Sequence, residues 1–255
     1  MSRRPDLPAA PALPPVQSYA RLAGVLYLII IVIGVSSEAL IRGRLIVDGD
    51  PDATAQHILG AQFLWRLGIA GEDVLLICAV GLTALWYVLL RPVDRRLTQL
   101  AIAFAFVSLA VESVGALHLH AVLTPLHGGA YLASTDPGLL HVLAYQSVVA
   151  HAHAFGLALI FFGVECLLIG HLIRRSGLFP AAVGVLMQLA GLCYLVNSFS
   201  MILSPALQGM LFPFILLPSL VGESTFCLWL LIKGVDVAAW TRRADVMQGP
   251  ASTPA

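Results

Sequence analysis

The chain has 255 residues, of which 59% are hydrophobic and only 11% are charged, and its mean hydropathy is +0.90. Soluble domains carry about 25% charged residues, so this composition excludes a water-soluble globular domain. The 14 basic and 14 acidic residues balance, and no basic patch with interleaved aromatic residues points to a nucleic-acid partner.

Six apolar stretches dominate the chain, and each is long enough to cross a membrane. A spanning helix needs about 20 apolar residues to cover a hydrocarbon core of roughly 30 Å. The stretches are continuous rather than alternating, which favours helices over a β-barrel. They lie at 20–41, 63–90, 97–123, 141–173, 178–203 and 210–233. The sequence therefore predicts an all-α fold, a polytopic membrane bundle of six transmembrane helices over residues 19–235, with the lipid bilayer as its surroundings.

The segments outside these stretches predict an orientation. Residues 1–18 contain five prolines and are expected to form a disordered tail, and residues 236–255 form a second tail. Lys and Arg mark cytoplasmic loops, so we expect both termini in the cytoplasm and the protein in the inner membrane of a cell. The basic side carries Arg3, Arg4, Arg21, Arg91, Arg95, Arg96, Arg174, Arg175, Lys233, Arg242 and Arg243.

The opposite, outer side has the two longest loops, at about 43–62 and 124–140. It holds Arg42 and Arg44 together with several aspartates. Asp50 followed by Pro51 is typical of a helix cap, and it predicts a short surface helix that includes His57.

Ionisable groups inside the spans are the candidates for function, because each is costly in lipid unless it is paired or hydrated. The leading candidates are Glu38, Arg66, Asp73, Glu112, His151 and Glu223. At about 1.5 Å per residue, Asp73, Glu112 and His151 lie in the outer half of their helices. Glu38 and Arg66 lie nearer the outer rim, and Glu223 lies near the midplane.

Helix geometry sorts these residues further. Arg66 and Asp73 are seven positions apart and share a face, whereas Glu72 points about 120° away. His151 and His153 point about 200° apart, so they cannot chelate one ion, because helical chelation needs a spacing of three or four. The cysteines lie inside spans without a CxxC pair and are expected to be buried apolar residues. The sequence assigns no metal site and no cofactor.

Two interpretations of the polar residues stay open. Arg66, Asp73, Glu112 and one histidine of the fourth span form a buried network that fixes helix register, or they line an outward-facing pocket for a small solute, a proton or a metal. Pro213 and Pro218 fall inside the predicted sixth span, near Glu223. They predict a kink or a break in this helix. A broken helix beside a midplane acid is typical of transporter sites. The alternative interpretation is a kink that the bundle tolerates and that has no role in transport.

Several stretches resemble a known family. They are RLAGVLYL at 21–28 with Glu38 further along, WRLGIA at 65–70, FFG at 161–163, GHLIRRSG at 170–177, GLCYL at 191–195, and GE at 222–223 before LWLLIKG at 228–234. Over about 18–235 the chain resembles the DUF4386 family of uncharacterised bacterial membrane proteins. The resemblance implies a multi-helix inner-membrane protein without an assigned activity, and it draws attention to Glu38, Arg66, Asp73 and Glu223. The histidines at 118, 120, 151 and 153 are peculiar to this chain.

Three hypotheses of function follow. The first is a non-enzymatic membrane protein that acts as a small-solute or proton-coupled transporter, with Asp73 and Glu223 as proton-carrying acids and Arg66 as counter-ion or anion clamp. The second is a membrane-embedded enzyme that binds a metal or haem through carboxylates and histidines. The third is a structural or assembly partner, in which Gly184 and Gly191 on the fifth span allow close helix contact. Six helices are few for one transporter subunit, so a homodimer is an arrangement that agrees with the sequence.

Overall fold

The computed structural model describes residues 16–129 and 132–248, and every regular element in this part of the chain is helical. Six segments are long and apolar enough to cross a membrane: Val16–Leu45, Gln62–Leu90, Arg95–His127, Pro137–Ser176, Ala181–Leu203 and Phe214–Ile232. The prediction of an all-α bundle with six membrane spans is thereby confirmed. The predicted disorder of the N-terminal tail falls on residues 1–15, which lie outside the described residues, and Val16 already begins a helix.

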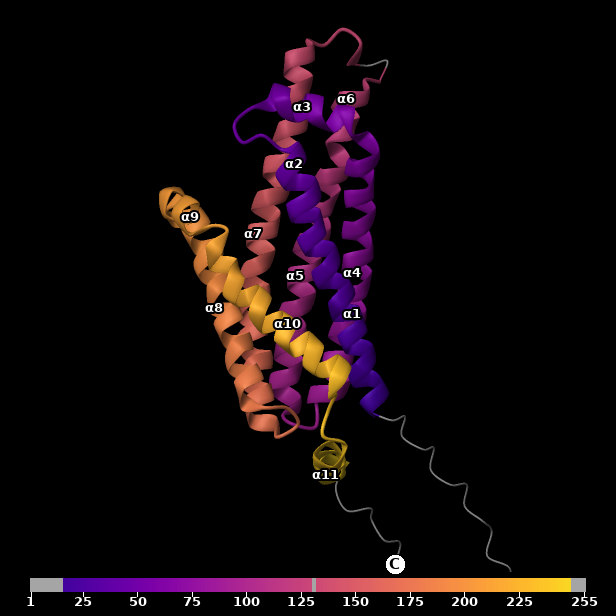
Figure 1. Ribbon diagram of the computed structural model, residues 1–255, viewed down its shortest axis with the longest axis vertical. Helices are drawn as coiled ribbons and strands as arrows, with labels where there is room; N and C mark the ends of the chain where they lie inside the picture. The colour runs from indigo at the N-terminus through magenta and orange to yellow at the C-terminus, as the bar shows by residue number, and fades with distance from the viewer. Residues whose placement is uncertain (1–15, 130–131, 249–255) are drawn as a thin grey trace, which may run out of the picture.

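The contacts between the six spans form a closed ring, and Figure 1 shows the spans from the side. The first span consists of α1 (Val16–Ser36), a π-helical turn (Ser37–Arg42) and α2 (Gly43–Leu45). It is followed by α4 (Gln62–Leu90), α5 (Arg95–Ala121), α7 (Pro137–Ser176), α8 (Ala181–Leu203) and α10 (Leu217–Ile232). Each packs against the next along the chain, and α10 packs back on α1. The first and last described elements lie at the same end of the bundle, which carries most of the basic residues.

An aromatic core holds the basic half of the bundle together. Trp86 of α4 stacks on Phe226 of α10 with ring centroids 5.0 Å apart. Tyr27 of α1 meets Trp86 edge-on at 6.0 Å, and Phe179 meets Phe226 edge-on at 5.4 Å. Buried side chains from all six spans surround these rings. This half is therefore a complete six-helix bundle.

Helices α7 and α8 approach each other at two pairs of glycines. A Cβ on Gly184 would lie 2.5 Å from the Gly170 carbonyl oxygen, and a Cβ on Gly191 would lie 2.5 Å from that of Gly163. Only glycine permits this backbone contact. The small face of α8 that we expected to be available for a partner protein is thus covered by α7 of the same chain.

The outer half of the bundle contains four spans and a cap. Its buried apolar cluster draws on the first span, α4, α5 and α7, and on the short helices α3 (Pro51–Gly60) and α6 (Leu123–His127). As predicted, Asp50 caps α3, since its Oδ1 accepts a hydrogen bond of 2.9 Å from the Ala53 amide. His141 Nδ1 lies 2.6 Å from Asp52 Oδ1 and joins α7 to this cap. Figure 1 shows α3 and α6 at the end opposite α11.

Helix α7 exceeds the other spans in length. Its 40 residues extend about 60 Å, roughly twice a hydrocarbon core of about 30 Å. Its basic end, at Arg174 and Arg175, aligns with the ends of α4 and α8, so its first turns rise beyond the bilayer into the outer cap (Figure 1).

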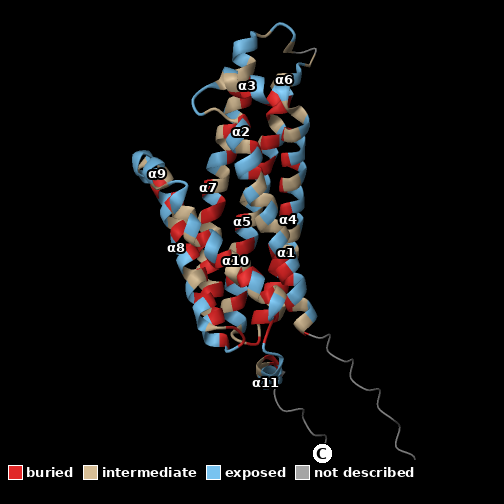
Figure 2. Ribbon diagram, in the orientation of Figure 1, coloured by how far each residue is buried: buried red, intermediate tan, exposed pale blue. Residues whose placement is uncertain are grey.

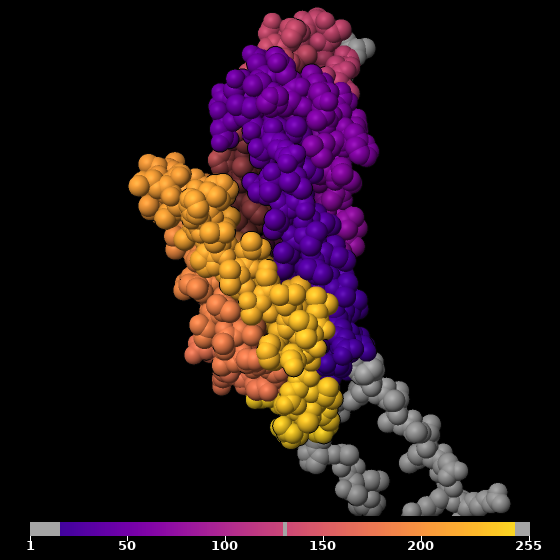
Figure 3. Space-filling view, viewed as in Figure 1, coloured from indigo at the N-terminus to yellow at the C-terminus, as the bar shows by residue number. Residues whose placement is uncertain are grey.

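The last two spans form a shorter hairpin through α9 (Pro205–Leu211). The predicted sixth span, 210–233, is broken at Pro213, as one of the two interpretations expected, whereas Pro218 causes no kink. Pro213 precedes the 3-10 turn Phe214–Leu216, and Pro218 occupies the first turn of α10. Proline is accepted there because the amides of a first turn have no intrahelical acceptor. In Figure 3 this hairpin stands apart from the outer part of α1, with a hollow between them.

Burial separates an inner from an outer surface on every span (Figure 2). Large apolar side chains cover the outside, among them Phe63 at 79%, Ile77 at 72%, Leu203 at 78% and Ile232 at 69% exposure. Such a surface would aggregate in water and is stable in lipid. The chain is therefore a multi-pass membrane protein.

Candidate functional site

Arg42 is the centre of a charged network in the outer half of the bundle. Its Nε lies 2.8 Å from Glu38 Oε2, and its Nη1 lies 3.2 Å from Glu72 Oε2. The Glu72 side chain is 4% exposed and the Arg42 side chain 16%, whereas the Glu38 side chain is 58% exposed. The network thus begins at the surface and continues into the bundle, with one guanidinium between two carboxylates.

A π-helical turn positions the arginine. Ser37–Arg42 continues α1 with a wider turn, so the helix extends past the apolar stretch that ends at Ile41. Single π-helical turns inside α-helices are frequent at functional sites. Here the turn places Arg42 against α4, where Glu72 shares the buried face with Trp65 and Ile69.

Glu112 of α5 and His151 of α7 complete this outer network. Glu112 lies near enough to Glu72 and Arg42 for their charges to interact. His151 is 5% exposed, its Nδ1 lies 3.2 Å from the Gly115 carbonyl oxygen, and Arg42 and Glu72 are also near enough to influence its charge. The first span, α4, α5 and α7 therefore each contribute at least one ionisable side chain to the same interior region.

Two of the predicted site residues lie outside this network. Asp73 is half exposed and lies 3.4 Å from His120 Nε2. Arg66 lies on the surface with its Nη2 3.5 Å from His127 Nε2, and the same nitrogen of His127 is 2.8 Å from Gln62 Oε1. The network that we expected from Arg66 and Asp73 is built instead from Arg42 and Glu72.

Glu223 occupies a second polar site in the basic half. It is 7% exposed, and its Oε1 accepts a hydrogen bond from the Tyr194 hydroxyl of α8. The Tyr27 hydroxyl of α1 faces the same carboxyl group, and Glu165 of α7, 6% exposed, lies near it. Among the described residues, no Lys, Arg or His nitrogen lies within 4.0 Å of either glutamate.

Two polar atoms without partners lie about one helical turn from this acid site. Asn197 and Ser198 follow Tyr194 by three and four positions on α8, and such positions share a helix face. Asn197 Oδ1 and Ser198 Oγ are buried and have no hydrogen-bond partner in the described part of the chain. Buried polar atoms are almost always bonded, so this surface has capacity for a further polar group.

Comparison with known proteins gives the family of this chain. Residues 22–234 match the family described as a domain of unknown function, DUF4386. The chain belongs to the DUF4386 family. A similar protein of Archaeoglobus fulgidus, described as an uncharacterized protein, is 25% identical over 166 residues, which are 65% of this chain and 83% of that protein. No solved structure matches the chain.

The two polar sites of this DUF4386 protein lie at different depths. At about 1.5 Å per residue, Glu72 is about 27 Å above the basic end of α4, whereas Glu223 is about 14 Å above the basic end of α10. A hydrocarbon core is roughly 30 Å thick, so Glu72 lies near its outer boundary and Glu223 near its middle. Within residues 16–129 and 132–248, no three His, Cys, Asp or Glu side chains are grouped as a metal site would require.

Sequence reasoning missed Arg42, Glu72 and the two tyrosines. Arg42 was assigned to the outer loop, because the apolar stretch ends one residue before it. The face of Glu72 could have been found, since Trp65, Ile69 and Glu72 follow one another at spacings of four and three. No sequence signal connects Tyr27, Tyr194 and Glu223, which come from the first, fifth and sixth spans.

Proposed function

We propose that this DUF4386 protein is a proton-coupled transporter of a small polar solute, and that Glu223 binds and releases the coupled proton. The observation that carries the proposal is a buried carboxyl group near the membrane midplane, bonded to a tyrosine hydroxyl and with no Lys, Arg or His nitrogen within 4.0 Å among the described residues. Such a group in lipid must be neutral, hydrated or paired. Because no described side chain supplies a positive charge to Glu223, we infer that a bound proton neutralises it.

The neighbours of Glu223 support a role in solute binding as well. Asn197 Oδ1 and Ser198 Oγ offer hydrogen bonds to a polar solute in this part of the bundle. Solute and proton would then share one region, which is the requirement for coupling their movements. The outer network of Arg42, Glu38 and Glu72 lies nearer the outer surface, where its paired charges hold the helices around this region in place.

Transport in vesicles tests the proposal. The protein is reconstituted in liposomes that contain a pH-sensitive dye, and amino acids, monosaccharides, carboxylates and organic cations are added one at a time. We expect at least one of them to cause proton movement that Glu223→Gln abolishes and Tyr194→Phe reduces. Asp73→Asn is the control, because this half-exposed acid lies outside both polar sites, and its proton movement should equal that of the wild type.

The result for Glu223→Gln decides the outcome. Solute uptake coupled to protons at the wild-type rate in this variant would refute the assignment of Glu223. Absence of uptake for the whole panel, in protein that remains folded, would count against transport itself.

We also propose the orientation expected from the loop charges, with the basic end of the bundle in the cytoplasm and the protein in the inner membrane of a cell. Reporter fusions after Gln248 and within the outer loop near Gly49 test this orientation. A phosphatase active only outside the cytoplasm should be active at Gly49 and inactive after Gln248, and the reverse result would contradict the proposal.

A further inference from the structure

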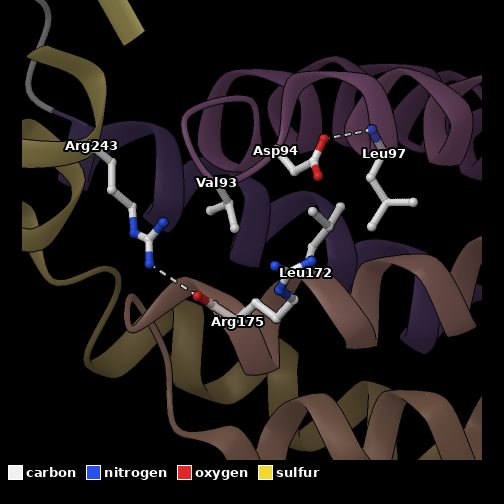
Figure 4. Close-up of a pocket in the computed structure, with 6 residues that line it drawn as sticks. All are labelled: Val93, Asp94, Leu97, Leu172, Arg175 and Arg243. Atoms are coloured by element: carbon white, nitrogen blue, oxygen red, sulfur yellow. Dashed lines mark hydrogen bonds between the residues drawn. The ribbon is translucent and has the colours of Figure 1, made fainter. Parts of the chain in front are cut away.

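A recess at the basic end of the bundle lies between the start of α5, the end of α7 and α11 (Val237–Gln248). Its narrow part is a cavity of about 150 Å³ (Figure 4), lined by Val93, Asp94, Leu97, Leu172, Arg175 and Arg243. A wider part of about 610 Å³ also contains Val93 and Arg243 and continues past Arg242 and Val246 of α11. Because Val93 and Arg243 line both parts, the two cavities are adjacent, and together they are called the recess.

Helix α11 forms the outer wall of this recess and is fixed to the bundle at three points. Trp240 Nε1 donates a hydrogen bond of 3.1 Å to the Leu89 carbonyl at the end of α4. Arg243 Nη2 donates one of 3.0 Å to the Arg175 carbonyl at the end of α7. The Asp236 amide donates one of 3.2 Å to the Leu178 carbonyl. The wall is therefore an ordered part of the fold.

The cations of the recess have no acidic partner within the described ranges. No carboxylate oxygen lies within 4.0 Å of a guanidinium nitrogen of Arg175, Arg242 or Arg243. The two aspartates in the lining act as helix caps: Asp94 accepts from the Leu97 amide at 3.0 Å and Asp236 from the Ala239 amide at 2.9 Å. Guanidinium groups bind phosphate oxygens with paired hydrogen bonds.

The apolar surface beside these cations points to a lipid. Val246 is 83% exposed, and Val237 and Met247 are 47% and 42% exposed, so α11 presents apolar side chains beside Arg242. A helix with apolar and basic residues at the ends of membrane spans is typical of one that lies in the interface with the headgroups. The end of α4 at Leu90 and that of α7 at Ser176 border the recess, so it opens at headgroup depth.

We propose that this recess binds the phosphate of an anionic phospholipid from the leaflet at the basic end. Arg175 and Arg243 contact the phosphate, Arg242 adds a third positive charge, and Val93 and Val246 contact the glycerol and the first acyl carbons. Basic pockets between spans bind anionic headgroups in this way. The bound lipid joins α5, α7 and α11, and the site is independent of the transport function proposed above.

Lipid titration of the full chain tests the site. The protein is purified in a neutral detergent, and dioleoylphosphatidylglycerol or dioleoylphosphatidylcholine is added while the melting temperature and the lipids retained in native mass spectrometry are measured. We expect phosphatidylglycerol to stabilise the protein saturably and phosphatidylcholine to have little effect. Arg175→Gln with Arg243→Gln should weaken phosphatidylglycerol binding by about thirtyfold.

Matched variants distinguish lipid binding in the recess from attraction of the lipid to general surface charge. Arg95→Gln with Arg96→Gln removes the same charge at the exposed start of α5, outside the recess, and should retain wild-type binding. Because Arg243→Gln also removes a bond that holds α11, Arg175→Gln alone is a second test: its backbone carbonyl still accepts from Arg243, and binding should weaken about fivefold.

Three results would overturn the proposal. If Arg95→Gln with Arg96→Gln weakens phosphatidylglycerol binding as much as Arg175→Gln with Arg243→Gln does, the lipid is attracted by general surface charge and not bound in a site. Equal stabilisation by phosphatidylcholine would show that the phosphate charge is not recognised. Stabilisation by sn-glycerol 3-phosphate as strong as by phosphatidylglycerol would identify a site for a free phosphate anion rather than for a lipid.

Discussion

The outer network and the inner acid site use the same residue type in opposite ways. In the outer network, Glu38 and Glu72 both contact Arg42, so their charges are compensated by a cation. In the inner site, Glu223 and Glu165 have tyrosine hydroxyls and apolar groups around them and no cation within 4.0 Å among the described residues. A compensated carboxylate fixes helices in place, whereas an uncompensated one is free to exchange a proton.

Removal of Arg42 should have the largest effect. Arg42→Gln leaves the buried Glu72 carboxylate without its cation, and the loss of one partner of a buried pair costs about 3–5 kcal/mol. Unfolding in detergent, followed by circular dichroism against denaturant, measures this loss. Arg42→Gln with Glu72→Gln should recover most of the stability, and a single variant as stable as the wild type would contradict a structural role for the pair.

Packing at the α7–α8 contact gives the next effect. Gly184→Val puts a side chain against the Gly170 carbonyl oxygen, and such overpacking costs about 1–3 kcal/mol. Gly60→Ala at the end of α3 is the control, because no neighbouring atom lies within 4 Å of the position that its new Cβ would take, and its melting temperature should match that of the wild type. Equal melting temperatures for both variants would mean that α7 and α8 do not pack so closely.

Neutralisation of the inner acid should cost little stability, in contrast to the outer network. The amide oxygen of Glu223→Gln still accepts from Tyr194, and no cation loses its partner, so the free energy of unfolding should change by less than about 1 kcal/mol. Denaturant unfolding beside the transport assay separates the two properties. A loss as large as that of Arg42→Gln would show that Glu223 is ionised and paired, which would remove the basis of the proposed proton site.

The pair of Asp73 and His120 should matter least. Both side chains are about half exposed, 50% and 47%, and exposed pairs contribute about 0–1 kcal/mol. Asp73→Asn should therefore unfold with the wild-type transition. A cost comparable to that of Gly184→Val would mean that this acid is shielded from water in the membrane.

The fold was predictable because long apolar stretches leave few alternatives in a bilayer. The second predicted span, 63–90, differs from α4 by one residue. The sixth span begins several residues later than predicted, since the stretch 210–233 is broken at Pro213 and Pro218 occupies the first turn of α10. Apolar periodicity could not show this, because a proline in a first turn and a proline at a kink occur in equally apolar surroundings.

The polar sites were predictable only in part. Counting residues along the sixth span places Glu223 near the midplane, as the sequence suggested. The choice of Asp73 over Glu72 followed from the face shared with Arg66, whereas Trp65 and Ile69 determine which face is buried. Arg42 depends on a π-helical turn, and the tyrosines depend on the ring closure of α10 on α1. These are tertiary features that local patterns do not encode.

Helix α7 has a mechanical consequence for any conformational cycle of this protein. Its 40 residues run without interruption from the outer cap to the basic end, with proline only at its first position. Because its interior contains no proline, we expect it to move as one rod together with the outer cap bonded to it. The hairpin α8–α9–α10 packs beside the lower part of this rod and carries Tyr194, Asn197 and Glu223. Alternating access would therefore require this hairpin to rock against α7. Spin labels on α9 and α3 would report this motion as a change in the distance between the two labels.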